Sequence, residues 1–333
     1  MLDAVNTTAS LSYAKAVNAA LLRALETYPE SILYGEDVAK PGGVFGVTKD
    51  VQKAFGSQRV FDTPISETAM LGAAVGAAMT GLRPIVEIMW IDFSLVAMDQ
   101  IVNQAANVRY VSAGRLQAPL TIRTQQGVLP GACAQHAQNL EAFYAHVPGL
   151  RVGLPATPQD AYDMLLAAVA SDDPTLVIEN RGLYHGAAQE VVLNGPIEPA
   201  SGAKRIQEGE AATIVTWGAI RHKVTAVTDR LAQQGIKLDV IDARWVAPFD
   251  WETVLASVEK TGRLLIVHEA NLTGGFGAEI AASVQERCFG RLKAPVMRCA
   301  TPDARIPAAP HLQEALVPNE ARIEKQIRKL LAL

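Results

Sequence analysis

Short apolar runs typical of β-strands alternate along the chain with longer stretches in which apolar residues recur at the spacing of an α-helix. The strand patterns lie at residues 32–34, 85–90, 120–123, 150–154, 176–179, 213–217, 238–242, 264–268 and 296–298. The helical patterns between them cover residues 13–28, 95–110, 160–170, 221–234, 251–259 and 278–289. This alternation predicts an α/β fold, with parallel sheets that carry helices on both faces.

The alternation stops between residues 186 and 209, where Gly, Pro and polar residues replace the helical period. The chain has 333 residues, of which 49% are hydrophobic, enough for two domains with separate cores. We therefore predict two α/β domains, residues 1–190 and residues 200–333.

The composition limits which classes of partner and which cellular compartment are expected. The net charge of -4 comes from 34 acidic and 30 basic side chains without a Lys/Arg block, so neither nucleic acid nor an anionic membrane is an expected partner. Three cysteines without paired spacing favour a reducing compartment over a zinc site or a disulfide framework. The first ten residues lack a secretion signal, and the apolar run 69–82 is too short to span a membrane. We expect a cytoplasmic protein.

Glu67 is a single acid at the start of the apolar, small-residue run 69–82. Burial would raise the pKa of its carboxyl, which suits a proton donor or relay. Alternatively, Ser66 caps a helix and Glu67 complements the helix dipole, which would lower that pKa, so the sequence leaves the direction open. Gly72 and Gly76 indicate that another helix, from this chain or from a partner, packs closely against this run.

The positions of other polar residues make them candidate site residues. Glu36 and His268-Glu269 stand at the ends of strand patterns, where parallel sheets bind ligands, although loop acids in water are the simpler interpretation. His136 follows a Gly- and Pro-containing loop and precedes an amphipathic helix. It could transfer protons near neutral pH, or it could be a hydrogen-bonded residue at a helix start.

Eight short motifs, spread over nearly the whole chain, are specific in combination. They are Gly35-Glu36-Asp37-Val38, Gly42-Gly43-Val44-Phe45, Asp62-Thr63-Pro64-Ile65-Ser66-Glu67, Gly81-Leu82-Arg83-Pro84, Asp99-Gln100-Ile101, Ala134-Gln135-His136, His146-Val147-Pro148-Gly149-Leu150 and Gly274-Gly275-Phe276-Gly277-Ala278-Glu279. With them the chain resembles the beta subunit of the thiamine-diphosphate-dependent, decarboxylating component of 2-oxo acid dehydrogenase complexes, the pyruvate, branched-chain and acetoin dehydrogenase group.

The resemblance implies a transketolase-like pyrimidine-binding domain followed by a transketolase C-terminal domain, in an alpha2-beta2 heterotetramer. The alpha subunit would bind the magnesium and the diphosphate, since this chain has no Gly-Asp-Gly followed by a downstream Asn. The acyl group would pass to a lipoyl group on the transacylase component. The substrate stays open among pyruvate, branched-chain 2-oxo acids and acetoin. The alternatives are a split transketolase-like subunit that transfers sugar fragments and a non-catalytic scaffolding subunit.

The resemblance also implies roles for single residues. Glu67 would hydrogen-bond the aminopyrimidine ring of thiamine diphosphate and support the tautomer that generates the nucleophile. Met89 and Phe93 would line that ring, and Glu36 would belong to a proton path between paired active sites. His136 would be the active-site histidine that supplies a proton when the dithiolane opens.

A potassium site is a further implication of the resemblance. Leu120, Ala168 and Asp173 match positions of a potassium-binding loop, some of which would act through backbone carbonyl groups. Ser171 stands near this loop where relatives frequently carry an acid.

Overall fold

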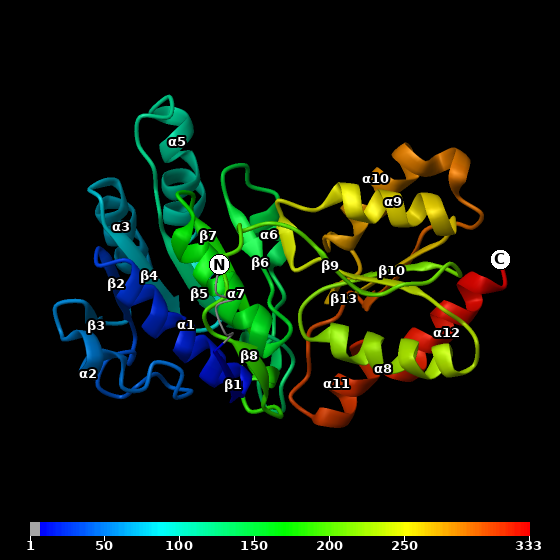
Figure 1. The fold of residues 1–333 in the computed structure, drawn as a ribbon, viewed down its shortest axis with the longest axis horizontal. Helices are drawn as coiled ribbons and strands as arrows, with labels where there is room; N and C mark the ends of the chain where they lie inside the picture. Colours follow the sequence, from blue (N-terminus) through cyan, green and yellow to red (C-terminus); the bar gives the residue numbers. More distant parts are fainter. Residues whose placement is uncertain (1–6) are drawn as a thin grey trace, which may run out of the picture. The chain divides into compact units, whose positions relative to one another are not determined.

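Two large β-sheets and one two-stranded sheet organise the described residues, which divide into two units (Figure 1). The computed structural model describes residues 7–333. The first unit consists of the chain up to Gln126 together with His146–Ala200, and the second consists of Gly127–Ala145 and Ser201–Leu333. The segment Gly127–Ala145 therefore belongs with the second unit, although both of its ends join the first.

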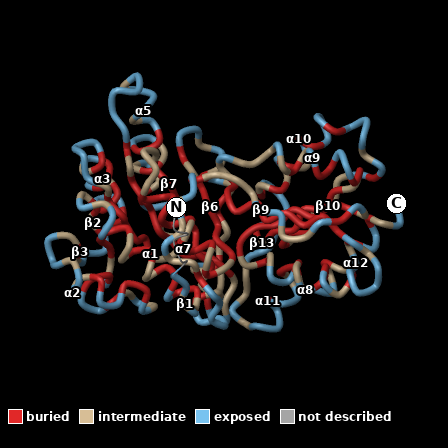
Figure 2. Tube along the Cα trace, in the orientation of Figure 1, coloured by how far each residue is buried: buried red, intermediate tan, exposed pale blue. Residues whose placement is uncertain are grey.

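The strands of the first unit form a parallel arrangement in the order β6-β7-β5-β4-β2-β3. All residues of the two strands β5 and β7 are buried, as expected for strands with helices on both faces (Figure 2). Two further strands, β1 and β8, form an antiparallel ribbon. The bounds are β1 Thr8–Leu11, β2 Ser31–Gly35, β3 Val60–Asp62, β4 Arg83–Ile88, β5 Thr121–Gln126, β6 Arg151–Gly153, β7 Thr175–Asn180 and β8 Gln189–Val192.

Helices cover this sheet on both faces, because successive side chains of a strand point in opposite directions. Leu33 of β2 packs in the apolar core formed with α1 (Tyr13–Thr27) and α7 (Pro158–Ala170). The next residue, Tyr34, donates a hydrogen bond of 3.0 Å to the carbonyl of Met70 in α3 (Glu67–Met79). The short helix α2 is Val51–Phe55.

The helix expected at residues 95–110 is broken into short pieces. They are α4 (Ile91–Ser94), a 3₁₀ turn (Leu95–Ala97), a π-helical turn (Gln100–Gln104), a second 3₁₀ turn (Ala105–Asn107) and α5 (Val108–Val111). Near the second turn the backbone passes close to Gly149, where a Cβ atom would lie 2.3 Å from the Ala106 carbonyl oxygen. This approach and the π turn depend on tertiary contacts, which a helical period in the sequence does not reveal.

The second unit has the strand order β14-β13-β10-β11-β9, with only the edge strand β9 antiparallel. Ile214 of β10 packs in the core with α8 and α12, whereas Thr213 hydrogen-bonds to Ser257 of α9 at 2.7 Å, so α9 lies on the other face (Figure 1). The strands are β9 Lys204–Gln207, β10 Thr213–Thr216, β11 Asp239–Asp242, β12 Trp245–Ala247, β13 Leu264–Asn271 and β14 Met297–Thr301. The helices are α6 Glu141–Ala145, α8 Ile220–Gln233, α9 Trp251–Thr261, α10 Gly277–Cys288, α11 Pro310–Leu316 and α12 Glu320–Leu331.

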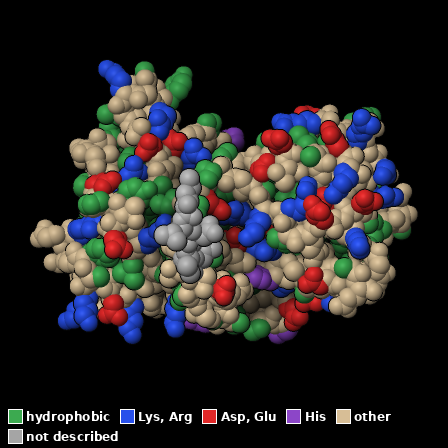
Figure 3. Space-filling view, viewed as in Figure 1, with side chains coloured by type: hydrophobic (Ala, Val, Ile, Leu, Met, Phe, Trp, Pro, Cys, Tyr) green, Lys and Arg blue, Asp and Glu red, His purple; other side chains and the backbone are tan. Residues whose placement is uncertain are grey.

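Charges are mixed on the surface that Figure 3 draws, where Lys and Arg side chains lie among Asp and Glu side chains on both units. Within residues 7–333, none of the helices combines the length and the apolar character that crossing a bilayer requires.

A buried histidine belongs to a central strand of the second sheet. His268 of β13 is fully buried, and its ring is stacked on Trp217 with centroids 5.2 Å apart. Gly277 lies so close that a Cβ there would be 2.6 Å from His268 Nε2. Burial, helped by the charge of Arg298, lowers the pKa of His268 to about 4.

We expect His268 to make the second unit sensitive to acid. Its pKa in the folded state, about 4, lies below the ordinary 6.5, so the unfolded chain binds the proton first and stability falls as the pH decreases from 6.5 to 4. The full difference between the two pKa values corresponds to roughly 3 kcal/mol of stability.

Urea unfolding followed by tryptophan fluorescence across this pH range measures the loss of stability. His268→Phe should flatten the dependence, while the exposed-site control His311→Gln should keep it. An equal acid loss in His268→Phe and in the wild type would refute this origin.

Candidate active site

Four of the predicted site residues follow the carboxyl ends of three adjacent strands. Glu36 comes directly after β2 and Met89 directly after β4, with Phe93 in the helix α4 that follows. Glu67 is the first residue of α3, which follows β3. Because β4, β2 and β3 are neighbours and parallel, their carboxyl ends lie at one edge of the sheet. Ligands of open α/β sheets bind at such an edge.

Two hydrogen bonds fix the loops that carry the two acids. The Ala39 N–H donates to Asp62 Oδ1 at 2.7 Å, and the Thr63 N–H donates to the Gly35 carbonyl at 2.9 Å. These bonds connect the loop after β2 to the end of β3, and the loop after β3 to the end of β2. The positions of Glu36 and Glu67 are therefore set together.

The backbone is tight and strained next to Glu36. A Cβ at Gly35 would lie 2.8 Å from the Glu87 carbonyl oxygen, so only glycine fits between β2 and β4 at this point. Asp37 and Trp90 have positive φ values of 57° and 66°, a conformation that costs non-glycine residues energy. Such strain is concentrated at functional sites, and here it follows two of the three strands that define the edge.

The carboxyl groups of Glu36 and Glu67 are close enough to influence each other. Glu67 is only 9% exposed, and Glu36 is partly buried. Burial raises the pKa of Glu36, and the charges of Glu67, Asp37 and Glu87 raise it further. Glu36 therefore keeps its proton to a higher pH than an ordinary glutamic acid, and a perturbed pKa of this kind is typical of functional sites.

The small residues of α3 face two different surroundings. A Cβ at Gly72 would lie 3.3 Å from the side chain of Gln100, in the π-helical turn of this chain. Among the described residues, no heavy atom lies within 4 Å of a Cβ built at Gly76. The close neighbour predicted for this helix is thus part of the same chain at Gly72, while Gly76 is exposed.

A buried ionic network, absent from our sequence-based predictions, lies below this edge. Arg123 is fully buried and forms two hydrogen bonds of 2.8 and 3.0 Å with Glu179. Its Nη1 donates to Glu87 at 2.7 Å, and Tyr184 donates to Glu179 at 2.5 Å. Burial raises the pKa of Glu87, and the charge of Glu179 raises it further, whereas Arg123 lowers it. Two acids share this one guanidinium. Since Glu87 also raises the pKa of Glu36, the network influences the site electrostatically.

His136 belongs to the second unit, within the segment Gly127–Ala145. It is half-buried and ends a 3₁₀ turn, Cys133–Gln135. The first unit therefore brings together Glu36, Glu67, Met89 and Phe93, whereas the predicted histidine is held by different elements.

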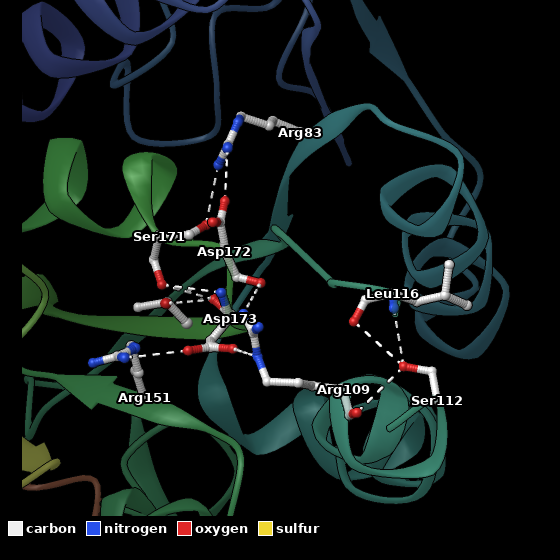
Figure 4. A network of polar contacts seen from close by, with 9 residues as sticks. Arg83, Arg109, Ser112, Leu116, Arg151, Ser171, Asp172 and Asp173 are labelled. Carbon is white, nitrogen blue, oxygen red and sulfur yellow. Dashed lines mark hydrogen bonds and ion pairs between the residues drawn. The ribbon is translucent and has the colours of Figure 1, made fainter. Parts of the chain in front are cut away.

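The predicted potassium loop is surrounded by guanidinium groups (Figure 4). The carboxylate of Asp173 accepts from Arg109 at 2.7 Å and from Arg151 at 3.2 Å. Arg83 binds the neighbouring Asp172 at 2.8 Å and also donates to backbone carbonyl groups of this loop. The carboxylates of Asp172 and Asp173 are thus paired with guanidinium groups.

The backbone oxygens of the same loop are also engaged. The Leu120 carbonyl accepts from the Thr175 N–H at 2.9 Å, and the Ala168 carbonyl accepts from the Ser171 N–H at 3.2 Å. The Asp173 carbonyl accepts from the hydroxyl groups of Ser171 and Thr175. Because a carbonyl oxygen has a second lone pair, these bonds do not test the potassium site, which stays a prediction. Within residues 7–333, no cluster of three His, Cys, Asp or Glu side chains is placed to hold a metal ion.

Comparison with known families and proteins identifies the class of protein. Residues 9–186 match the family "Transketolase, pyrimidine binding domain", and residues 201–323 match "Transketolase, C-terminal domain". A solved structure described as "Split gene transketolase, inactive beta4 tetramer" superposes with a TM-score of 0.79 and 20% identity, covering 98% of this chain and 99% of that chain. This similarity confirms the predicted two-domain α/β fold.

Curated relatives identify the group within this class. The chain is 38% identical to "Acetoin:2,6-dichlorophenolindophenol oxidoreductase subunit beta" of Cupriavidus necator, over 96% of this chain and 97% of that protein. It is 36% identical to "2-oxoisovalerate dehydrogenase subunit beta" of Bacillus subtilis (96% and 98%) and 39% identical to "Pyruvate dehydrogenase E1 component subunit beta" of Leifsonia xyli (97% and 95%). The chain belongs to the family of these dehydrogenase beta subunits, which confirms the resemblance inferred from its motifs.

Proposed function

We propose that this chain is the beta subunit of a cytoplasmic, thiamine-diphosphate-dependent dehydrogenase that acts on pyruvate, a branched-chain 2-oxo acid or acetoin. It would form an alpha2-beta2 heterotetramer and be active only with its alpha subunit. The observation that carries this proposal is the buried Glu67 beside Glu36, at the strand ends of a pyrimidine-binding domain.

The residues at this edge fit the aminopyrimidine ring of the coenzyme. The carboxyl group of Glu67 can form a hydrogen bond with the ring, and the partly buried side chains of Met89 and Phe93 offer apolar surface to it. When bound, thiamine diphosphate supplies a carbon nucleophile and an electron sink for cleavage of the substrate. The alpha subunit would hold the magnesium and the diphosphate, because this chain lacks the sequence motif for them.

Glu67 and Glu36 would manage the protons of the first half-reaction. A hydrogen bond between Glu67 and the ring orients the ring and stabilises the protonation state that the reaction needs. Glu36, whose pKa is raised by burial and by the carboxylate of Glu67, is a proton reservoir beside it. The raised pKa matters because proton transfer is most efficient when the pKa of the group lies closer to the working pH.

In the second half-reaction the acyl group would pass to a lipoyl group of the transacylase component. Two electrons from the substrate carbon reduce the dithiolane, whose S–S bond breaks. One sulfur receives the acyl group, and the other receives a proton, which His136 would donate. An imidazole is suited to this task because its ordinary pKa lies near neutrality.

We expect the purified chain, mixed with its alpha subunit, thiamine diphosphate and magnesium, to acylate a lipoyl domain with pyruvate, a branched-chain 2-oxo acid or acetoin. A spectrophotometric assay measures the activity with each of these substrates, and a parallel assay measures the activity with sugar phosphates. Each subunit alone is the control and should be inactive. Turnover of sugar phosphates, without turnover of the 2-oxo acids or acetoin, would contradict the proposal and indicate a split transketolase.

A further inference from the structure

The segment Gly127–Ala145, here called the His136 segment, is held by polar contacts at several points of the second unit. Gln313 of α11, which is buried, donates to the Leu129 carbonyl at 2.8 Å. The Gly131 N–H donates to the Ala308 carbonyl at 3.2 Å. Farther along, the Trp217 Nε1–H donates to Glu141 at 3.1 Å, and both side chains are buried.

Glu269 of β13 joins the two sides of this segment. Its Oε1 accepts from the Val128 N–H at 2.9 Å, and its carboxyl is also hydrogen-bonded by the side chain of Asn139. Val128 and Asn139 flank His136 in the sequence. One carboxyl group therefore fastens the chain before and after the histidine.

The strand that presents Glu269 is itself well anchored. β13 lies between β10 and β14, and the Thr301 hydroxyl donates to the Glu269 carbonyl at 2.5 Å. Burial and the nearby Glu141 raise the pKa of Glu269, whereas the bonds from Val128 and Asn139 and the charge of Lys223 lower it. The acid is thus built into the unit at a cost in desolvation, and its hydrogen bonds to the His136 segment offset that cost.

We infer that Glu269 is a positioning residue for His136: its carboxyl closes the loop between Val128 and Asn139 and so fixes where the imidazole is presented. This inference rests on the proposed role of His136 as the proton donor to the lipoyl group. A catalytic group that is misplaced by about 1 Å can lose on the order of 10²-fold in rate, so loosening the loop should be visible in kinetics.

Two substitutions at Glu269 weaken its hydrogen bonds to different extents. Glu269→Ala removes both acceptor bonds, and Glu269→Gln retains one acceptor oxygen. Glu286→Gln, an exposed acid in α10 of the same unit, is the matched control. All variants are assembled with the alpha subunit and compared with His136→Ala.

Two rates and one structural signal are measured in the assembled enzyme. The first rate is substrate oxidation with an artificial two-electron dye, which needs no lipoyl group, and the second is acylation of a lipoyl domain. The structural signal is amide hydrogen exchange in residues 127–140.

We expect lipoyl acylation to fall about tenfold more than dye reduction in Glu269→Ala, with Glu269→Gln between it and the wild type. Hydrogen exchange should become faster in the His136 segment and stay unchanged in the control. Unchanged exchange would overturn the anchoring, and equal losses in both rates would overturn the positioning role. If the His136→Ala enzyme acylates the lipoyl domain at the normal rate, the proposed role of His136 is wrong. That conclusion holds whatever effect the Glu269 variants have on hydrogen exchange.

Discussion

Replacing Glu67 with glutamine should lower the turnover of the assembled enzyme by about 10²- to 10⁴-fold, the range typical of a positioned acid or base. Glutamine has nearly the same size and keeps a hydrogen-bond donor, but its amide cannot exchange a proton. Because the side chain is only 9% exposed, water cannot readily replace the carboxyl. Steady-state assays of the alpha–beta pair, with lipoyl domain as acceptor, measure the loss.

Two controls separate chemistry from folding in this experiment. Glu190→Gln changes an exposed acid of the same unit and should leave turnover unchanged. Size-exclusion chromatography of Glu67→Gln with the alpha subunit should show normal assembly. Normal assembly together with normal turnover would instead support the scaffolding alternative, in which this chain only supports the alpha subunit.

Replacing Arg123 with methionine should destabilise the first unit by about 3–5 kcal/mol, the cost of leaving buried charges without a partner. Arg123 is fully buried between Glu87 and Glu179, so its loss leaves two carboxyl groups to face each other. Urea unfolding of the isolated chain, followed by circular dichroism, gives the free energy of unfolding.

Two comparisons show whether burial is the cause. Arg230→Met breaks an exposed network with Glu320 and Glu324 and should have little effect. Combining Arg123→Met with Glu87→Gln and Glu179→Gln should recover part of the loss, because no buried charge then lacks a partner. An Arg123→Met variant as stable as Arg230→Met would refute the structural role of the network.

Most central strands could be predicted from the sequence because they contain short apolar runs and are buried on both faces. The patterns at 120–123 and 176–179 correspond to β5 and β7, whose residues are all buried. The edge strand β9 (Lys204–Gln207) was missed, since it is short and polar, with no residue fully buried. The broken helix at 95–110 was missed because its irregular turns depend on distant contacts such as that with Gly149.

The candidate site was only partly predictable. Glu36 was a candidate because it follows a strand pattern, and Glu67 because it is a single acid before an apolar run. The network of Glu87, Arg123 and Glu179 depends on strand register, which brings together residues far apart in the chain. Charged residues inside strand patterns, Glu87 and Arg123 above all, were the available signal, since a buried charge needs a partner.

The contacts of Glu269 could not be predicted from the sequence for a different reason. Its position at a strand end was visible in the sequence, but its partners Val128 and Asn139 were not. They belong to a segment that joins two strands of the first unit while it packs with the second. Nothing in the local pattern of residues 127–145 reveals which sheet that segment accompanies.

A crystal structure of the chain assembled with its alpha subunit, thiamine diphosphate and magnesium would test the central claim most directly. We predict a carboxyl oxygen of Glu67 within about 2.6–3.2 Å of a nitrogen of the aminopyrimidine ring, with the diphosphate bound by the alpha subunit. A coenzyme bound away from the strand ends of the first unit, with Glu67 in contact with solvent, would contradict the account.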